Sequence, residues 1–311
     1  MRKALVLGIE HEMGALLCKT LAKYNWHVTA TIDDPSQPIE LTHNLTLAEI
    51  SPTETDFLDE LIEDSDTVFL HLPDPTLGGQ VLFPLETITA LIAKHKRHLV
   101  LTTNFYEVKP SLFSAFTFWR EKKPLPIALS AKLHSQLERA AEAGAHITVR
   151  CCGHSLSCAQ QHGYLGMLIK ETHNKLIVQS PSRYTLNHYW TFLPDLAENI
   201  VHQLSTPIAK QLDTPRALDV TYYPGHQASI KDIARCLALS SGKPVTVTHL
   251  HWTVMECISL FSPLFRGFLS MRRIWQHGSQ IPSQRSSTAS QAALFHTPLE
   301  LALQQSWRHM K

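Results

Sequence analysis

The first 34 residues constrain the fold of this chain more than any other stretch. An apolar run at 5–7 ends at Gly8, and a second glycine, Gly14, follows six residues later. Apolar residues then recur at helical spacing, and a second apolar run at 26–32 ends in two aspartates. Short apolar runs bounded by turn residues are typical of buried strands, whereas recurrence at three- and four-residue steps indicates a helix. The stretch therefore predicts a strand, a tight turn, a helix, a second strand and a terminal acid.

A unit of this kind can bind a dinucleotide at its turn. Glycine lets the backbone approach a pyrophosphate, and the N–H groups and dipole of the helix N-terminus stabilise the negative charge. The residues expected around the phosphates are Gly8, His11, Met13 and Gly14. His11 stands where a glycine would allow the closest approach, and Glu10 adds negative charge beside it. A turn that is purely structural, in a fold that has lost its cofactor, is therefore the alternative.

The acid after the second strand is expected to accept hydrogen bonds from the cofactor's ribose diol. Asp33 is the first candidate for this role, and its neighbour Asp34 is the alternative. A carboxylate at this position repels a 2′-phosphate, so the sequence favours NAD over NADP.

Strands alternate with helices through the first 150 residues. The further strands are expected at 44–50, 67–72, 98–103 and 147–149, and the helices between them end in a long one at 127–144. This alternation predicts an α/β fold with a Rossmann-type, doubly wound parallel sheet. Ligands of such sheets bind outside the carboxyl ends of the strands. The strand-terminal residues expected to share one crevice are Gly8, Asp33, Leu72, Asn104 and Arg150.

The second half of the chain has a different pattern, because proline and serine become common and the alternation weakens. We expect residues 1–163 to form an NAD(P)-binding Rossmann domain to which 185–222 returns. Residues 164–184 and 223–311 are expected to form a smaller, mostly helical C-terminal lobe that covers a substrate. Within it, residues 252–275 are strongly apolar with interleaved arginines. A buried helical pair is favoured there over a membrane-surface helix, because a proline interrupts the segment.

Charge and cysteine content narrow the function classes. With 28 basic and 27 acidic side chains, the net charge of +1 gives no electrostatic case for nucleic acid or an anionic membrane. The six cysteines form no CxxC pair and no signal peptide is evident, which predicts reduced thiols in a cytoplasmic protein. The spacing His249-x-His251 has no acid or cysteine pattern beside it, so we expect no metal site. The expected partner is a small molecule, and homodimerisation stays open.

Short motifs along the chain resemble those of one superfamily. They are Leu5–Gly14, Glu49-Ile50, Val68–Pro73, Leu99–Asn104, Val149-Arg150, Phe192–Ala197 and Leu294–Glu300. In this order they resemble the extended and atypical short-chain dehydrogenase/reductase superfamily, the NAD-dependent epimerase/dehydratase group, over the whole chain. The resemblance implies a bound NAD(P), with Glu49 near the adenine and Leu72 near the cofactor ribose.

The active site of that superfamily contains Tyr-x-x-x-Lys, in which the tyrosine is the general acid/base and the lysine lowers its pKa and holds the ribose. Lys132 matches the lysine, but Ala128 stands at the tyrosine position. Alignment on Glu138 instead places Ser130 and His134 there. Both registers stay open, and neither supplies a tyrosine.

No tyrosine occurs between Glu107 and Gly163, so the standard catalytic site is absent. Proton transfer needs a group of suitable pKa within hydrogen-bond reach. The remaining candidates are Lys132 on the ribose, Asn104 at the usual Ser/Thr position, and Tyr106 as a substitute proton donor. Arg150 is expected to orient the substrate.

Two function classes follow. In the first, the chain is an NAD(P)-dependent oxidoreductase or epimerase/dehydratase that acts on a small or nucleotide-linked substrate with a non-standard acid/base. In the second, it is a non-catalytic sensor or scaffold that binds a dinucleotide or another ligand. The missing tyrosine and the altered glycine motif favour the second class. The bulky apolar lobe favours the first.

Overall fold

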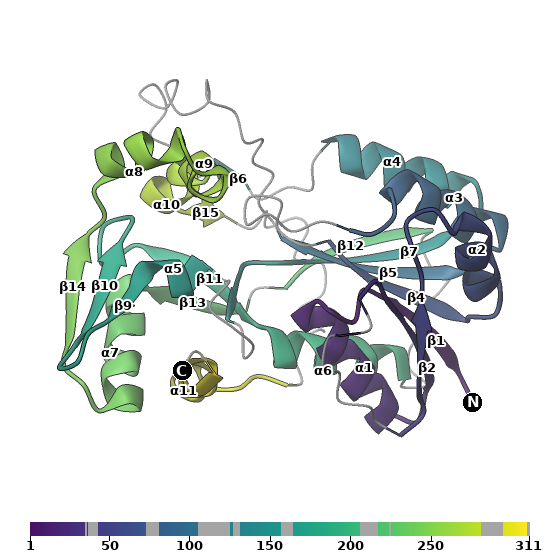
Figure 1. Cartoon of the computed structure of the whole chain (residues 1–311), viewed down its shortest axis with the longest axis horizontal. Coiled ribbons are helices and arrows are strands. Elements are labelled where there is room, and N and C mark those ends of the chain that lie inside the picture. Colours follow the sequence, from purple (N-terminus) through teal and green to yellow (C-terminus); the bar gives the residue numbers. More distant parts are fainter. Residues whose placement is uncertain are drawn as a thin grey trace.

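The computed structural model describes residues 1–34, 36, 43–72, 81–104, 125–126, 131–156, 164–205, 217–223, 225–280 and 295–309. A large sheet flanked by helices occupies one end of the molecule, and a smaller lobe occupies the other (Figure 1). The predicted α/β fold with a second, smaller unit is confirmed.

The large sheet has seven strands in the order β12-β7-β5-β4-β1-β2-β3. Its strands are β1 (Lys3–Leu7), β2 (His27–Ile32), β3 (Leu45–Glu49), β4 (Thr67–His71), β5 (His98–Asn104), β7 (His146–Cys152) and β12 (Leu218–Tyr222). Every neighbouring pair is parallel. The chain winds outward from β1 to β3 and then starts again at β4 on the other side of β1. This reversal places the switch point, where such sheets bind ligands, between β1 and β4.

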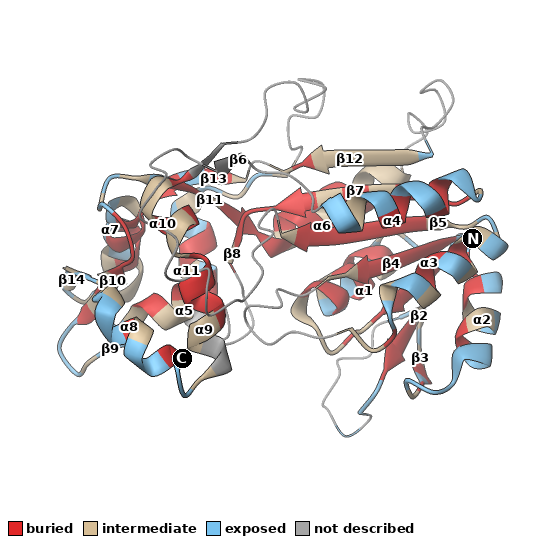
Figure 2. Ribbon diagram, turned by 90° about the horizontal axis from the view of Figure 1, so that it is seen from above, coloured by how far each residue is buried: buried red, intermediate tan, exposed pale blue. Residues whose placement is uncertain are grey.

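Helices cover both faces of this sheet. One layer contains α1 (Glu12–Lys23) and α6 (Leu193–Ser205), and the other contains α2 (Thr55–Glu63), α3 (Leu85–Lys94) and α4 (Ala131–Glu142). On β1, Ala4 and Val6 belong to the core under α1 and α6, whereas Leu5 and Leu7 belong to the core under the other layer. Because both faces are covered, the central strands are apolar at consecutive positions, and they are buried along most of their length (Figure 2).

The lobe contains two three-stranded sheets as well as helices. One sheet has the order β13-β11-β8 and the other β14-β10-β9. The strands are β8 (His154–Leu156), β9 (Ile169–Glu171), β10 (Leu176–Ser180), β11 (Asn187–Phe192), β13 (His226–Ser229) and β14 (Val245–His249). The helices are α5 (Tyr164–Leu168), α7 (Ile230–Ser241), α8 (Trp252–Ser259), α9 (Pro263–Ser270), α10 (Arg272–His277) and α11 (Leu299–His309). Two short strands, β6 (Leu125–Pro126) and β15 (Ser279–Gln280), pair in parallel beside them.

Aromatic rings fill the core of the lobe. Trp190 and Trp275 are fully buried, and the imidazole of His154 stacks on Trp275 with ring centroids 4.1 Å apart and planes 3° from parallel. Burial holds the pKa of His154 well below its ordinary value, so the ring is neutral. The lobe therefore has an independent core, which α7, α9, α10 and α11 help to enclose.

Three sequence expectations need correction in detail. Residues 252–275 form three helices and not a pair, because Pro263 begins a new helix at its first position and a further break occurs at Met271. Within 185–222, α6 and β12 return to the large sheet, but β11 pairs with β8 and β13 of the lobe. The helix expected at 127–144 ends earlier, at Glu142 in α4, and residues 127–130 lie outside the described residues.

Candidate functional site

The turn between β1 and α1 has the backbone geometry that the sequence predicted. Gly8 adopts φ +85°, and its N–H donates to the side chain of Thr31 on β2 at 3.0 Å. The next N–H, that of Ile9, donates to the carbonyl oxygen of Thr31 at 3.1 Å. A Cβ added to Gly14 would overlap the carbonyl oxygen of Gly8. Gly14 is therefore required for close packing of helix on strand, and both glycines serve the turn.

Two polar side chains occupy this turn. Glu10 is largely buried, and Oε1 of Glu10 lies 3.9 Å from Nε2 of His11. The other carboxylate oxygen of Glu10 is buried and has no hydrogen-bond partner in the described part of the chain. Burial raises the pKa of Glu10, and the charge of Asp33 raises it further. A buried carboxylate oxygen without a hydrogen-bond partner is costly, and such an atom is a candidate for ligand contact.

His71 is a third polar residue here, and the sequence analysis did not single it out. It ends β4, the strand next to β1, and its Nδ1 lies 2.9 Å from Oγ1 of Thr102 on β5. Burial, together with the nearby His11, lowers the pKa of His71 to about 4, so the imidazole is neutral. A polar residue at the end of an otherwise apolar strand was the available sequence signal.

The described residues enclose a cavity of about 20 Å³ at this turn. Its lining includes Gly8, Glu10, His11, His71 and Phe83. That volume is close to the space of one water molecule. Residues 73–80, which follow β4, lie outside the described residues.

Of the two acids after β2, Asp33 is the better candidate for a ribose contact. Both are exposed, but the carboxylate of Asp34 accepts from the N–H and the hydroxyl of Ser36 at 3.0 and 2.6 Å. Asp34 is therefore engaged in its own turn. Asp33 lies near enough to Glu10 to influence its pKa. Glu49 is exposed at the end of the edge strand β3.

The side chains of Met13 and Leu72 pack against the two hydrophobic cores of the large sheet. The side chain of Met13 is buried in the core under α1 and α6. Leu72 packs against the other core, and its N–H donates to the carbonyl oxygen of Thr102 at 2.8 Å.

The candidate catalytic residues that the structure describes lie on β5 and α4. Asn104 ends β5, and its Oδ1 lies 3.6 Å from the thiol of Cys152. Lys132 is exposed on the first turn of α4. His134 forms a pair with Glu138 one helical turn away, at 3.2 Å, as a surface histidine would. Tyr106 and Ser130 lie outside the described residues.

Arg150 lies within β7, so the expectation that the strand ends there is wrong. Cys151 and Cys152 continue the strand, because they pair with the last two residues of β5 and are fully buried. The guanidinium of Arg150 donates to the carboxylate of Asp219 at 3.0 Å and to the hydroxyl of Thr221, both on the neighbouring β12. These contacts tie two strands together.

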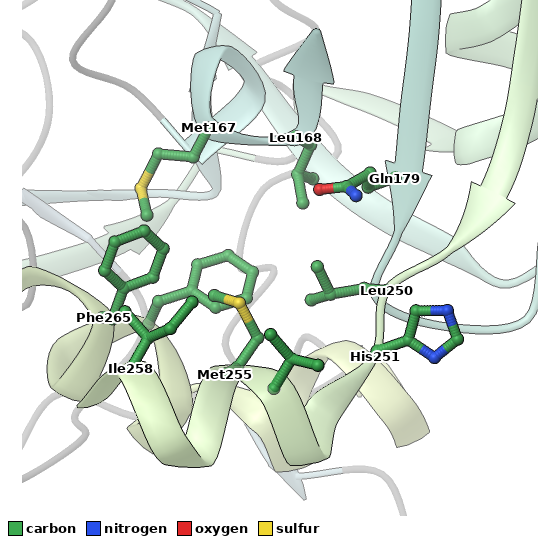
Figure 3. Close-up of a pocket in the computed structure, with 10 residues that line it drawn as sticks. Met167, Leu168, Gln179, Leu250, His251, Met255, Ile258 and Phe265 are labelled. Atoms are coloured by element: carbon green, nitrogen blue, oxygen red, sulfur yellow. The ribbon is translucent and has the colours of Figure 1, made fainter. Parts of the chain in front are cut away.

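The lobe contains a larger cavity, of about 320 Å³ (Figure 3). Apolar side chains from α5, α8 and α9 line most of it, including Met167, Met255 and Phe265. Two polar side chains, Gln179 on β10 and His251 just before α8, also line it. Its volume suits a small, largely apolar molecule. It shares no lining residue with the cavity at the β1–α1 turn.

Among known proteins, no family model and no curated protein matches the chain. Solved structures do match it. One is a nucleoside-diphosphate-sugar epimerase from Staphylococcus aureus, with 14% identity and a TM-score of 0.66 over 98% of this chain and 100% of that one. The chain has the fold of this protein. The predicted resemblance is thus confirmed at the level of the fold.

Two further solved structures share the architecture. NmrA, a negative transcriptional regulator, in complex with NADP has 12% identity and a TM-score of 0.61 over 100% of this chain and 92% of that one. Triphenylmethane reductase from Citrobacter sp., complexed with NADP(H), has 12% identity and a TM-score of 0.59 over 98% of this chain and 100% of that one. No helix within the described ranges is long and apolar enough to cross a bilayer.

Proposed function

We propose that this chain binds a nicotinamide dinucleotide at the β1–α1 turn and acts as a ligand sensor without the standard Tyr-x-x-x-Lys chemistry. The observation that carries the proposal is the turn itself. Gly8 at φ +85° and the tight contact of Gly14 with Gly8 keep the backbone geometry that lets a pyrophosphate approach the N-terminus of α1. His11 is the N-cap residue of α1, beside the expected position of the pyrophosphate.

In this proposal the pyrophosphate lies against α1 and Asp33 accepts from the adenosine ribose, which favours NAD over NADP. Glu49 lies on the adenine side and Leu72 on the side of the other ribose. NmrA, which shares the fold, is known in complexes with NAD and with NADP and is described as a regulator. The five cysteines in the described ranges form no disulfide, which supports a reducing, cytoplasmic location.

An enzyme is the second candidate, and the lobe cavity favours it. A cavity of about 320 Å³ with two polar groups is suited to a small substrate. In this version Lys132 holds the cofactor ribose, Asn104 and Tyr106 supply the non-standard acid/base site, and Arg150 orients the substrate. The reaction would be an oxidoreduction or an epimerase/dehydratase reaction.

Thermal-shift titration with NAD⁺, NADH, NADP⁺ and NADPH tests the shared part of both candidates. A ligand that binds only the native state raises the melting temperature in a saturable way. We expect saturation with NAD⁺ or NADH, and a response to none of the four at millimolar concentration would contradict dinucleotide binding. Asp33→Ala should weaken NAD more than NADP.

Glu10→Gln is the sharper variant, because it removes a carboxylate from the pyrophosphate position. We expect this variant to bind the dinucleotide about tenfold more tightly than the wild-type chain does. The wild-type affinity should rise as the pH falls toward the raised pKa of Glu10, since the protonated acid no longer repels the phosphates. Glu10→Gln should remove this dependence, whereas Glu63→Gln, on the exposed end of α2, should leave it unchanged.

Turnover separates the two candidates. NADH fluorescence is followed with a panel of carbonyl compounds and nucleotide sugars. If the wild-type chain consumes NADH and the Lys132→Met variant does not, the result would favour the enzyme. Saturable binding of NADH without turnover of any compound in the panel would favour the sensor.

A further inference from the structure

Asp195, His226 and His296 bring three metal-binding side chains together at the junction of the two units. Asp195 lies in the first turn of α6, which packs on α1 beside the large sheet. His226 opens β13 of the lobe, and His296 lies in the segment before α11 (Figure 1). One ligand atom from each residue lies within 4.8 Å of the other two. Three separate parts of the fold thus converge on one point.

The carboxylate of Asp195 is held in a fixed orientation. Its Oδ2 accepts from the backbone N–H of Thr297 at 2.6 Å, and its Oδ1 accepts from the hydroxyl of Thr297 at 2.8 Å. Each oxygen keeps a second lone pair. Carboxylates that bind metals are commonly oriented by such outer hydrogen bonds. The bonds to Thr297 therefore leave Asp195 able to bind a cation.

The two imidazoles lie together with their centroids 4.5 Å apart and their planes tilted by 41°. Within the described part of the chain, neither imidazole makes a hydrogen bond. His226 is buried, and this burial, together with His296, lowers its pKa, which favours the neutral ring that a metal requires. Asp195 and Glu300 act in the opposite direction on that pKa. Two imidazoles close together gain more from a shared cation than from each other.

We propose that Asp195, His226 and His296 bind a zinc ion that fastens the lobe and the segment before α11 to α6. Two nitrogens and one carboxylate oxygen suit Zn²⁺ better than Mg²⁺ or Ca²⁺, which prefer oxygen ligands alone. At metal–ligand distances of about 2.0–2.1 Å, the donors of a tetrahedral zinc lie about 3.4 Å apart. His296 is exposed, so its ring is able to rotate and close the cluster. Water or Glu300 completes the fourth position.

No metal site was predicted from the sequence, because the sequence contains no closely spaced set of metal ligands. These three residues are far apart in the chain, and only the fold brings them together. Asp195 also belongs to a motif, Phe192–Ala197, whose resemblance to a known family gave it no ligand role.

The test uses untagged full-length chain treated with a chelator, and the probe is zinc chloride alone. Calorimetry should give one zinc per chain, and the melting temperature should rise with zinc concentration. Cobalt(II) in place of zinc should give the visible absorption of a tetrahedral site. His296→Ala and His226→Gln should each lower zinc affinity at least about tenfold.

If His226→Gln fails to fold, His296→Ala tests zinc binding by itself. His296 is exposed, so its replacement should leave the fold intact. The control is His249→Ala, which removes an exposed histidine from the other candidate pair. Zinc binding that is lost in His249→Ala, or that is unchanged in His296→Ala, would overturn the proposal, and so would no binding at millimolar zinc. None of these outcomes depends on whether a dinucleotide binds.

Discussion

The β1–α1 turn and the lobe cavity are the two places proposed above to contact a small molecule, and they are shaped by different means. The turn is shaped by backbone, since Gly8 and Gly14 bring two main-chain segments into contact and the described space there is about 20 Å³. The lobe cavity is shaped by side chains from several elements and encloses about 320 Å³. The turn therefore depends on positions that exclude even one methyl group, whereas the cavity depends on packing that is distributed over many residues.

Gly14→Ala should have the largest effect, because the added methyl group collides with the carbonyl oxygen of Gly8, a main-chain atom that cannot move aside alone. We expect the free energy of unfolding to fall by several kcal/mol, so that little folded protein remains at ambient temperature. Gly242→Ala is the control, since nothing lies within 4 Å of its added Cβ and only its φ of +66° opposes the change. This control should lower the free energy of unfolding, measured by urea denaturation, by about 1 kcal/mol. Equal losses of stability in the two variants would contradict the close main-chain contact at Gly14.

Trp275→Ala tests the lobe, where packing carries the structure. The indole is fully buried against His154 and Phe268, so its removal should cost about 3–5 kcal/mol. Val254→Ala, an exposed position on α8, should change stability by less than about 0.5 kcal/mol. If the lobe is an independent unit, calorimetry of Trp275→Ala should show its transition separating from that of the sheet. A single unshifted transition would argue against the distributed core.

Acid should destabilise both regions through buried neutral histidines. His71 near the turn and His188 in the lobe each have a pKa lowered to about 4 by burial, against 6.5 in the unfolded chain. Between these values the unfolded chain binds protons that the native chain does not, so stability falls from pH 6.5 to 4 and is flat above. His188→Asn should reduce this loss by up to about 3 kcal/mol. Unfolding curves that do not change over that range would contradict the assignment.

Ser229→Ala should have the smallest effect. Ser229 and Asp232 form a reciprocal capping box at the start of α7, so the loss should be about 1 kcal/mol. Ser262→Ala is matched to it, because Ser262 is the N-cap of α9 but its side chain makes no capping bond. That variant should be close to neutral. A larger loss in Ser262→Ala than in Ser229→Ala would show that local capping does not govern these lobe helices.

The parts of the fold that sequence patterns predicted are those set by local rules. The strands from Thr67 and from His98 and the turn at Gly8 each depend on residues within a few positions of one another. The end of β7 was misplaced, because Cys151 and Cys152 extend the strand only through pairing with β5. Local pattern carries no information about such a partner.

The candidate site was predicted only in part for the same reason. His71 enters the cavity at the turn because β4 pairs with β5 in a register that sets it beside Thr102. The lobe cavity combines residues from α5, β10, α8 and α9, and no short motif spans them. Sequence thus located the turn but not the side chains that neighbours bring to it.

The bonds between α6 and the segment before α11 have a consequence for the order of synthesis. Asp195 and Asn199 receive Thr297 and Phe295 as partners, and Thr297 is made 102 residues after Asp195. At about 5–20 residues per second, a ribosome leaves these polar groups of α6 without those partners for roughly 5–20 seconds. During that interval the nascent sheet can assemble around β1, but α6 still lacks its hydrogen bonds to the segment before α11. Because the chain is synthesised from its N-terminus, the hydrogen bonds that join α6 to the segment before α11 form late, after that segment has left the ribosome.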